Sequence, residues 1–173
     1  PEGIKGLILS CILSDTLEFR SPTTTETDRR IAALLARDLG IDIPSYAAEM
    51  FAAKSDVSAF SDAELLRMDA KAYTVDGVNL RVSVLETTAP ETILSRKDGL
   101  VAAMADAAAE DGADQVLLFV VDILREEATL LTPNDLTRTI AEKSFGVTVT
   151  GNSVVLPGIM SRKKQIIPVL KVN

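Results

Sequence analysis

Three consecutive cations near the C-terminus are the residues whose type and spacing point most clearly to chemistry. Arg162, Lys163 and Lys164 follow Ser161, at a position where the sequence predicts the start of a helix. The helix dipole is positive at that end and ordinarily favours acidic residues, so three cations there cost stability unless an anion lies among them. In a chain of net charge −7 this arrangement indicates a site for a phosphate-like anion, to which exposed amide N–H groups would add. The alternative is a solvated basic turn without a ligand.

Asp15 and Lys71 are two further candidates. Asp15 follows a nearly continuous apolar segment, residues 4–14, which predicts a helix buried between layers. A carboxylate delivered from a buried element needs a cation or a set of donors to offset its desolvation, so Asp15 is a candidate metal ligand. It could equally cap the next turn. Lys71 lies between a predicted short helix and the first predicted strand, where lysines are usually solvated.

The composition excludes several classes of site. The chain of 173 residues contains no histidine, the commonest general base and transition-metal ligand. A Ser-His-Asp triad, a Cys-His pair, an HExxH zinc site and a zinc finger are therefore excluded. Cys11 is the only cysteine, which excludes an intramolecular disulfide and a cysteine-cluster metal site and favours a reducing cytoplasm. Neither common glycine-rich phosphate motif occurs.

The net charge and the lengths of the apolar segments argue against two classes of binding partner. Eighteen basic against 25 acidic residues argue against binding to nucleic acid or to an anionic membrane through bulk charge. The uncharged apolar runs are far shorter than the roughly 20 residues that a membrane span needs. We therefore expect no nucleic acid and no membrane among the partners, and a cytoplasmic location.

The elements that must position these residues fall into two parts. Residues 61–173 predict a self-contained α/β domain with a mixed β-sheet, because hairpins and helix-linked strands both occur. Residues 1–54 are mostly helical, and residues 55–60 resemble a linker. The chain begins with proline rather than methionine, so we expect it to start partway through a longer protein.

Within the predicted α/β domain, the turn at Asp76-Gly77 predicts a type I′ hairpin. Residues 115–122 form an uninterrupted apolar run typical of a central strand, and residues 127–131 predict another strand. Asp122 either faces a site at the carboxyl edge of the sheet or caps the next turn. The segment 147–155 predicts a second hairpin, and residues 90–112 one long helix.

Helix starts are predicted from capping residues. Two pairs have capping-box spacing, Thr23 with Glu26 and Ser61 with Glu64. Thr132-Pro133 predicts a third helix start, and Gly40 predicts the end of the helix that begins near Glu26.

Three segments resemble the manganese-dependent, or family II, inorganic pyrophosphatases of the DHH phosphoesterase superfamily. They are residues 6–26, which contain Ser14-Asp15-Thr16, the motif Asp69-Ala70-Lys71, and residues 156–168, which contain Ser161-Arg162-Lys163-Lys164-Gln165. The resemblance covers essentially the whole chain, in order and at family-like spacing. It implies a two-domain fold, in which an N-terminal DHH domain carries the metals and a C-terminal domain closes over the substrate.

The resemblance also implies roles for particular residues. Asp15 matches a ligand of one manganese in a dinuclear site, for which Mg²⁺ or Co²⁺ are substitutes. Lys71 matches a lysine that binds a phosphate of the substrate, and Arg162 and Lys163 match the pair that clamps pyrophosphate. The family's other metal ligands, including its histidines, would lie before Pro1.

These roles lead to a functional expectation. The chain would be the tail of a DHH domain followed by the whole substrate-binding domain, from a homodimeric enzyme that hydrolyses pyrophosphate to two orthophosphates. It holds no complete set of catalytic residues, so we expect it to be inactive alone. The alternatives are a DHH-family exopolyphosphatase and a non-catalytic, phosphate-binding regulatory module.

Overall fold

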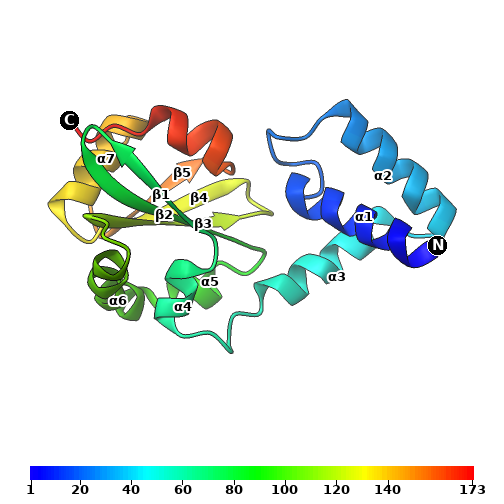
Figure 1. Ribbon diagram of the computed structural model, residues 1–173, viewed down its shortest axis with the longest axis horizontal. Coiled ribbons are helices and arrows are strands. Elements are labelled where there is room, and N and C mark those ends of the chain that lie inside the picture. The colour runs from blue at the N-terminus through cyan, green and yellow to red at the C-terminus, as the bar shows by residue number, and fades with distance from the viewer. The chain divides into compact units, whose positions relative to one another are not determined.

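The structure is a computed structural model that describes residues 1–173. The chain divides into two compact units, Pro1–Ser55 and Asp56–Asn173. The first unit is entirely helical, whereas the second contains a β-sheet with helices on both faces (Figure 1). The division falls within the predicted linker, although Ser55 still belongs to the last helix of the first unit.

The first unit consists of α1 (Glu2–Thr16), α2 (Glu26–Leu39) and α3 (Ile43–Ser55). Helix α2 ends at Gly40 as predicted, with φ of 67° at this glycine. Its start differs from the prediction, because the capping box joins Thr25 to Asp28. The Thr23 hydroxyl bonds instead to Ser21 Oγ, so it is not available to cap the helix.

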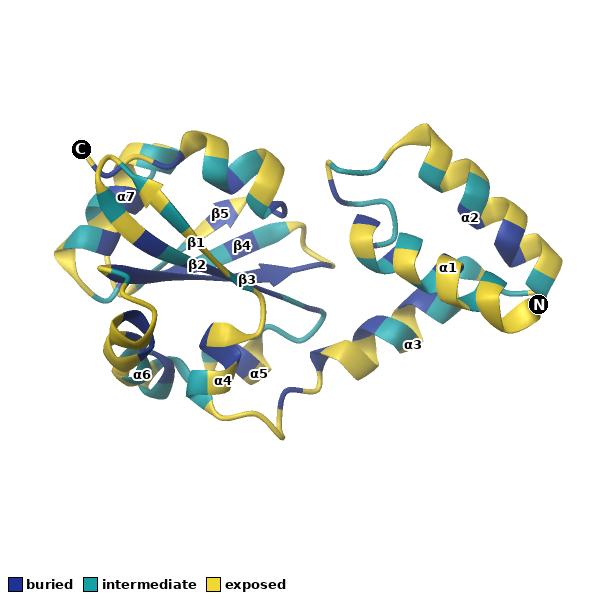
Figure 2. Ribbon diagram, in the orientation of Figure 1, coloured by how far each residue is buried: buried dark blue, intermediate teal, exposed yellow.

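The apolar segment at the N-terminus forms the predicted helix α1, but within this chain the helix is not buried between layers, because one side of it is exposed. Leu9 and Leu13 are fully buried, whereas Leu7 is 68% exposed and Cys11 is also exposed (Figure 2). Helices α2 and α3 both pack against α1. Two helices cover only part of an apolar cylinder, which leaves the other side of α1 uncovered.

The second unit contains a five-stranded mixed sheet, as predicted, in the order β1-β2-β3-β4-β5. Strands β2 and β3 are parallel, and the other three pairs are antiparallel. All eight residues of β3 are buried, as expected for a central strand. The strands are β1 (Ala70–Val75), β2 (Val78–Thr87), β3 (Gln115–Asp122), β4 (Glu127–Leu131) and β5 (Ser153–Pro157).

The β1–β2 turn has the backbone that the sequence predicts. Asp76 and Gly77 have φ of 51° and 82°. A type I′ turn requires positive φ at both central residues, which glycine adopts without strain and aspartate tolerates. Asp76 Oδ2 also accepts hydrogen bonds from the amides of Val172 and Asn173, so the turn anchors the C-terminal end of the chain.

Helices α4 (Asp62–Arg67), α5 (Glu91–Leu94) and α6 (Lys97–Glu110) cover one face of the sheet. The predicted Ser61–Glu64 capping box opens α4. The single helix predicted for residues 90–112 is wrong, because the chain leaves helical geometry at Arg96 and begins α6 there. The Arg96 side chain bonds to Asp62 and to the Phe60 carbonyl, contacts that local sequence does not encode.

The opposite face carries α7 (Asp135–Phe145), where Phe145 packs edge-to-face on Phe119 of β3 with ring centroids 6.1 Å apart. Helix α7 begins at Asn134, whose side chain accepts from the Thr137 amide, rather than at Thr132-Pro133.

The second predicted hairpin, residues 147–155, is also wrong. Only β5 forms there, and it pairs with the free edge of β4. The Thr132 amide donates to the Asn152 carbonyl at 2.8 Å, which extends this pairing and leaves residues 147–150 outside the sheet.

The chain ends in a short π-helical turn, η1 (Arg162–Ile166), and a 3₁₀ turn, η2 (Ile167–Val169). The predicted start at Ser161 is confirmed, since Ser161 Oγ accepts from the Lys164 amide at 3.2 Å. No helix of the chain is long and apolar enough to cross a membrane.

Candidate anion-binding site

Arg162 is held in a fixed position against the start of β1. Its Nη1 donates to the carbonyl oxygen of Asp69 at 2.6 Å and to that of Val82 at 3.4 Å. Its Nη2 donates to Asp69 Oδ1 at 2.8 Å. The side chain is only 12% exposed. These contacts join residues that are 93 and 80 positions apart, so the Arg162 side chain is not a freely solvated one.

Lys71 lies two residues beyond Asp69, at the same end of β1. In the β1–β2 register Lys71 pairs with Val82, so the two side chains share a face of the sheet. Arg81, which precedes Val82 in β2, lies on the opposite face and pairs there with Asp111 at the end of α6. In Figure 1 the red C-terminal segment, which contains η1, lies on the side of the sheet away from α6. Lys71 is exposed and forms no ion pair.

Lys163 shares the η1 turn with Arg162. It is exposed and no carboxylate pairs with it. Lys164 is exposed as well, and only its amide is engaged, by Ser161 Oγ. The structure thus brings Arg162 to the Lys71 end of β1 and places Lys163 beside Arg162, with both lysines unpaired. This arrangement suits a polyanion, because the two lysines supply uncompensated charge and the arginine a planar set of donors.

The side chain of Gln165 organises the basic turn. Its Oε1 accepts from the amides of Met160 and Ser161 at 2.9 and 3.0 Å. Its Nε2 donates to the Gly158 carbonyl at 2.7 Å. Gly158 has φ of 76°, a conformation that other residues rarely adopt. This role of Gln165 was not predicted from the sequence, where its position four residues after the Ser161 cap was the available signal.

These contacts change the expected contribution of the backbone. The amides of Met160, Ser161 and Lys164 are all bonded within the turn, and η1 spans only five residues. The cationic side chains, rather than a row of free helix N–H groups, are therefore what this turn presents to an anion.

Asp15 lies in the last turn of α1 and is exposed rather than delivered from a buried surface. Its carbonyl accepts from Thr23 Oγ1 at 3.3 Å. Its side chain borders a pocket of about 460 Å³. The pocket is lined by Leu7, Ile8, Cys11, Ile12, Asp15, Thr16, Thr23 and Asp28.

The backbone directly after Asp15 is unusual. Three consecutive non-glycine residues have positive φ, namely Leu17 at 50°, Glu18 at 52° and Phe19 at 68°. Left-handed geometry costs energy at each such residue, so it persists only where surrounding contacts impose it.

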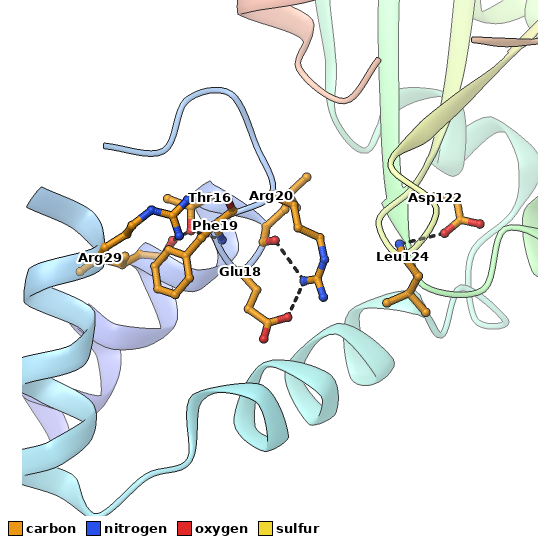
Figure 3. A network of polar contacts seen from close by, with 9 residues as sticks. Thr16, Glu18, Phe19, Arg20, Arg29, Asp122 and Leu124 are labelled. Atoms are coloured by element: carbon orange, nitrogen blue, oxygen red, sulfur yellow. Dashed lines mark hydrogen bonds and ion pairs between the residues drawn. The ribbon is translucent and has the colours of Figure 1, made fainter. Parts of the chain in front are cut away.

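Side chains on both sides of this strained segment hold it in place (Figure 3). Thr16 Oγ1 accepts from the Phe19 amide at 3.2 Å. Arg29 donates to the Phe19 carbonyl at 3.2 Å, and its guanidinium carbon lies 5.1 Å from the centroid of the Phe19 ring. Arg20 forms an ion pair with Glu18. The turn that follows Asp15 is therefore rigidly specified.

The residues of this chain do not by themselves form a metal site. No group of three or more His, Cys, Asp or Glu residues is close enough together to hold an ion. Asp28 borders the same pocket as Asp15, but its carboxylate accepts from the hydroxyl and amide of Thr25. These hydrogen bonds lower the pKa of Asp28 below its usual range. Asp15 therefore has one other carboxylate, that of Asp28, at this pocket.

Asp122 has the capping role that was one of its two interpretations. Its Oδ1 accepts from the amides of Leu124 and Arg125 at 2.9 and 3.1 Å and closes the turn between β3 and β4, as the Leu124 contact in Figure 3 illustrates.

Comparisons with known proteins decide the family. Residues 48–172 match the DHHA2 domain. The chain belongs to the DHHA2 family. The matched range of the DHHA2 domain contains Lys71, Arg162 and Lys163, whereas Asp15 lies before it.

Relatives of this DHHA2 protein agree with the resemblance seen in its motifs. A probable manganese-dependent inorganic pyrophosphatase of Deinococcus radiodurans is 44% identical over 176 residues, covering 99% of this chain and 56% of the relative. One from Bacillus licheniformis is 39% identical over 169 residues, covering 98% and 54%. The chain therefore spans about half the length of the curated relatives it matches, and the predicted resemblance is confirmed.

A solved structure extends the likeness to the fold. The crystal structure of a putative family II inorganic pyrophosphatase from Methanococcus jannaschii matches with a TM-score of 0.85 and 34% identity. The match covers 97% of this chain and 54% of that one. The predicted α/β fold with a mixed sheet flanked by helices is confirmed.

Proposed function

We propose that this DHHA2 protein is the substrate-binding part of a manganese-dependent inorganic pyrophosphatase, which hydrolyses pyrophosphate to two orthophosphates. The observation that carries the proposal is the position of Arg162, fixed at the Lys71 end of β1 with Lys163 in the same turn. The names of the relatives and of the structural neighbour supply the substrate and the manganese dependence.

The three cations have separate tasks in this proposal. Phosphoryl transfer depends on positioning and charge neutralisation more than on covalent chemistry with the protein. Arg162 offers paired N–H groups to two oxygens of one phosphate, and this orients the substrate. Lys71 and Lys163 act as point charges that neutralise the remaining oxygens and the charge that develops on the leaving phosphate.

Asp15 has a different task. We assign it as one ligand of a manganese site whose other ligands come from residues outside this chain, because the chain itself holds no cluster of ligands. Two manganese ions, with Mg²⁺ or Co²⁺ as substitutes, belong to this proposal. So do the assignment of residues 1–54 to a DHH domain, a homodimer of the longer protein and a cytoplasmic location.

The proposal is tested by separating binding from hydrolysis. The 173-residue chain is expected to bind pyrophosphate and to release no phosphate from it in the presence of Mn²⁺. Mn²⁺-dependent phosphate release by a preparation whose mass matches this chain would show that its residues complete a catalytic site. Absence of pyrophosphate binding would remove the substrate-binding role.

The two alternatives predict different results. An exopolyphosphatase would hydrolyse triphosphate faster than pyrophosphate when the longer protein that contains this chain is assayed with both. A regulatory module would bind phosphate compounds, but the longer protein would hydrolyse neither. Faster hydrolysis of pyrophosphate than of triphosphate supports the pyrophosphatase.

A further inference from the structure

We propose that Asp69 is a positioning residue for the substrate, because it holds one edge of the Arg162 guanidinium so that the other edge is presented to a phosphate. This inference rests on the proposed function, since it concerns how Arg162 meets pyrophosphate. It assigns a purpose to the first residue of the Asp69-Ala70-Lys71 motif, whose side chain would not itself contact the anion.

The hydrogen bonds of Arg162 divide its guanidinium into two edges. The end-on edge, made of Nη1 and Nη2, is occupied by the Asp69 carbonyl and carboxylate oxygens at 2.6 and 2.8 Å. Nη1 also donates to the Val82 carbonyl. The side-on edge, made of Nε–H and the second Nη2–H, has no partner within the chain. Two parallel donors of this kind match the spacing of two phosphate oxygens.

Both ends of this contact are anchored. The Asp69 carbonyl also accepts from the Val84 amide at 3.0 Å, so the backbone at Asp69 is tied to β2. The backbone at Arg162 is fixed by the Gln165 side chain through the Ser161 amide. A guanidinium held at both ends has little rotational freedom left to lose when a ligand binds, which raises affinity.

Charge alone would not favour an acidic residue here. The Asp69 side chain is about half exposed and contacts Arg162. It also lies only two residues from Lys71 in the sequence. A polyanion is repelled by that carboxylate, so a site optimised only for charge would lack it. Positioning and charge therefore predict opposite effects when Asp69 is replaced, and the sign of the change in affinity distinguishes them.

The test is calorimetric titration of pyrophosphate, without metal, into wild type and four variants of the 173-residue chain, namely Asp69→Ala, Asp69→Asn, Arg162→Ala and the double variant with alanine at both positions. Asp69→Ala is expected to weaken pyrophosphate affinity by about tenfold, despite the loss of a negative charge, because Arg162 loses a charge-assisted contact. Asp69→Asn keeps an oxygen in the same place and is expected to bind at least as tightly as wild type. In an Arg162→Ala background, Asp69→Ala is expected to tighten binding, since only the charge effect remains.

A second measurement tests whether the Nε–H edge of Arg162 contacts pyrophosphate. In nitrogen-detected NMR of the arginine side chains, pyrophosphate is expected to shift the Arg162 Nε–H resonance of the wild type and of Asp69→Asn. Far-ultraviolet circular dichroism of each variant confirms that it is folded. Should Asp69→Ala fail to fold, Asp69→Ser takes its place, since serine also removes the carboxylate contact to Arg162, and its affinity must likewise fall below that of wild type.

The outcomes separate this inference from the function on which it rests. If the wild-type chain binds no pyrophosphate, both are overturned. If wild type binds and Arg162→Ala weakens binding, but Asp69→Ala binds as tightly as wild type or tighter, only the positioning role of Asp69 is overturned.

Discussion

The side chain of Gln165 accepts a hydrogen bond from the Ser161 amide at 3.0 Å, so the last residue of the Ser161–Gln165 motif holds the first in place. The same oxygen accepts from the Met160 amide, and the Gln165 amide nitrogen donates to the Gly158 carbonyl. One glutamine thereby satisfies three backbone groups of the loop that precedes Arg162. The position of the cations depends on this contact as well as on Asp69.

Replacing Gln165 by alanine is expected to destabilise the second unit. The change leaves two amides and one carbonyl without their partner, which costs about 1–3 kcal/mol in the free energy of unfolding after partial solvation. Urea unfolding followed by circular dichroism measures the loss. Lys164→Ala is the matched control, because its exposed side chain has no partner, and it should change stability by less than about 0.5 kcal/mol. Equal stability of the two variants would mean that Gln165 does not organise the turn.

Arginine at position 162 should not be replaceable by lysine. The planar guanidinium of arginine can bond the Asp69 carbonyl, the Asp69 carboxylate and a phosphate at the same time. A lysine ammonium has a single nitrogen and cannot do so. Arg162→Lys is therefore expected to lose pyrophosphate affinity nearly as much as Arg162→Ala, whereas Lys163→Arg retains it, as calorimetric titration would show. Wild-type affinity in Arg162→Lys would indicate that only the charge at this position matters.

Gly99 of α6 is expected to tolerate no side chain, although alanine ordinarily stabilises a helix by about 1 kcal/mol over glycine. A Cβ at Gly99 would overlap with Asp62 Oδ2, and Arg96 holds that carboxylate in place through a hydrogen bond of 2.9 Å to Oδ1. Gly99→Ala should therefore lower the unfolding free energy by about 1–3 kcal/mol, the usual cost of overpacking.

The control for this prediction removes the obstacle. In an Asp62→Ala background the clash is absent, so Gly99→Ala should become neutral or stabilising in thermal unfolding. A stabilising effect of Gly99→Ala in the wild-type chain would contradict the close approach of α4 and α6 at this point.

Because of the Asp76 carboxylate, the free energy of unfolding should decrease as the pH falls into the acid range. The amides of Val172 and Asn173 donate to its carboxylate and hold the pKa of Asp76 below its usual range. A carboxylate whose pKa is lower in the folded than in the unfolded chain contributes stability above the unfolded pKa. That contribution is lost as the pH falls through the folded value.

The variant that tests this dependence is Asp76→Asn. It should be less stable than wild type at pH 7, and the difference should shrink as the pH is lowered below about 4, near the pKa of an unfolded aspartate. Asp106→Asn, at an exposed carboxylate of α6 without partners, serves as the control. Urea unfolding at pH 7 and pH 3 measures both, and a difference for Asp76→Asn that stays constant with pH would argue against the contact.

Local signals were sufficient for several elements. The Asp76-Gly77 turn was predictable because the positive φ that a type I′ turn requires is a property of those two residues. The end of α2 at Gly40 was predictable for the same reason, and the start of α4 at Ser61 because a capping box depends only on residues three positions apart. The three consecutive threonines, residues 23–25, offered alternative capping registers, and the contacts of Ser21 and Asp28 chose between them.

Other features depend on contacts between distant residues. Strand β5 was mistaken for half of a local hairpin, because only pairing with β4 selects which residues become extended. Among the site residues, Arg162 was identified from charge, but its contact with Asp69, which lies 93 residues away, has no local signature. The exposure of Asp15 followed from the packing of α1, which sequence periodicity alone does not give.

The measurement that tests the central proposal most directly is calorimetric titration of pyrophosphate into the wild-type chain and two triple variants of equal charge. One replaces Lys71, Arg162 and Lys163 by alanine, and the other replaces Lys97, Lys143 and Lys171. Saturable one-to-one binding is expected for the wild type and for the second variant, and no binding for the first. Equal affinity of the two variants would contradict the proposal, because pyrophosphate would then respond to net charge rather than to this site.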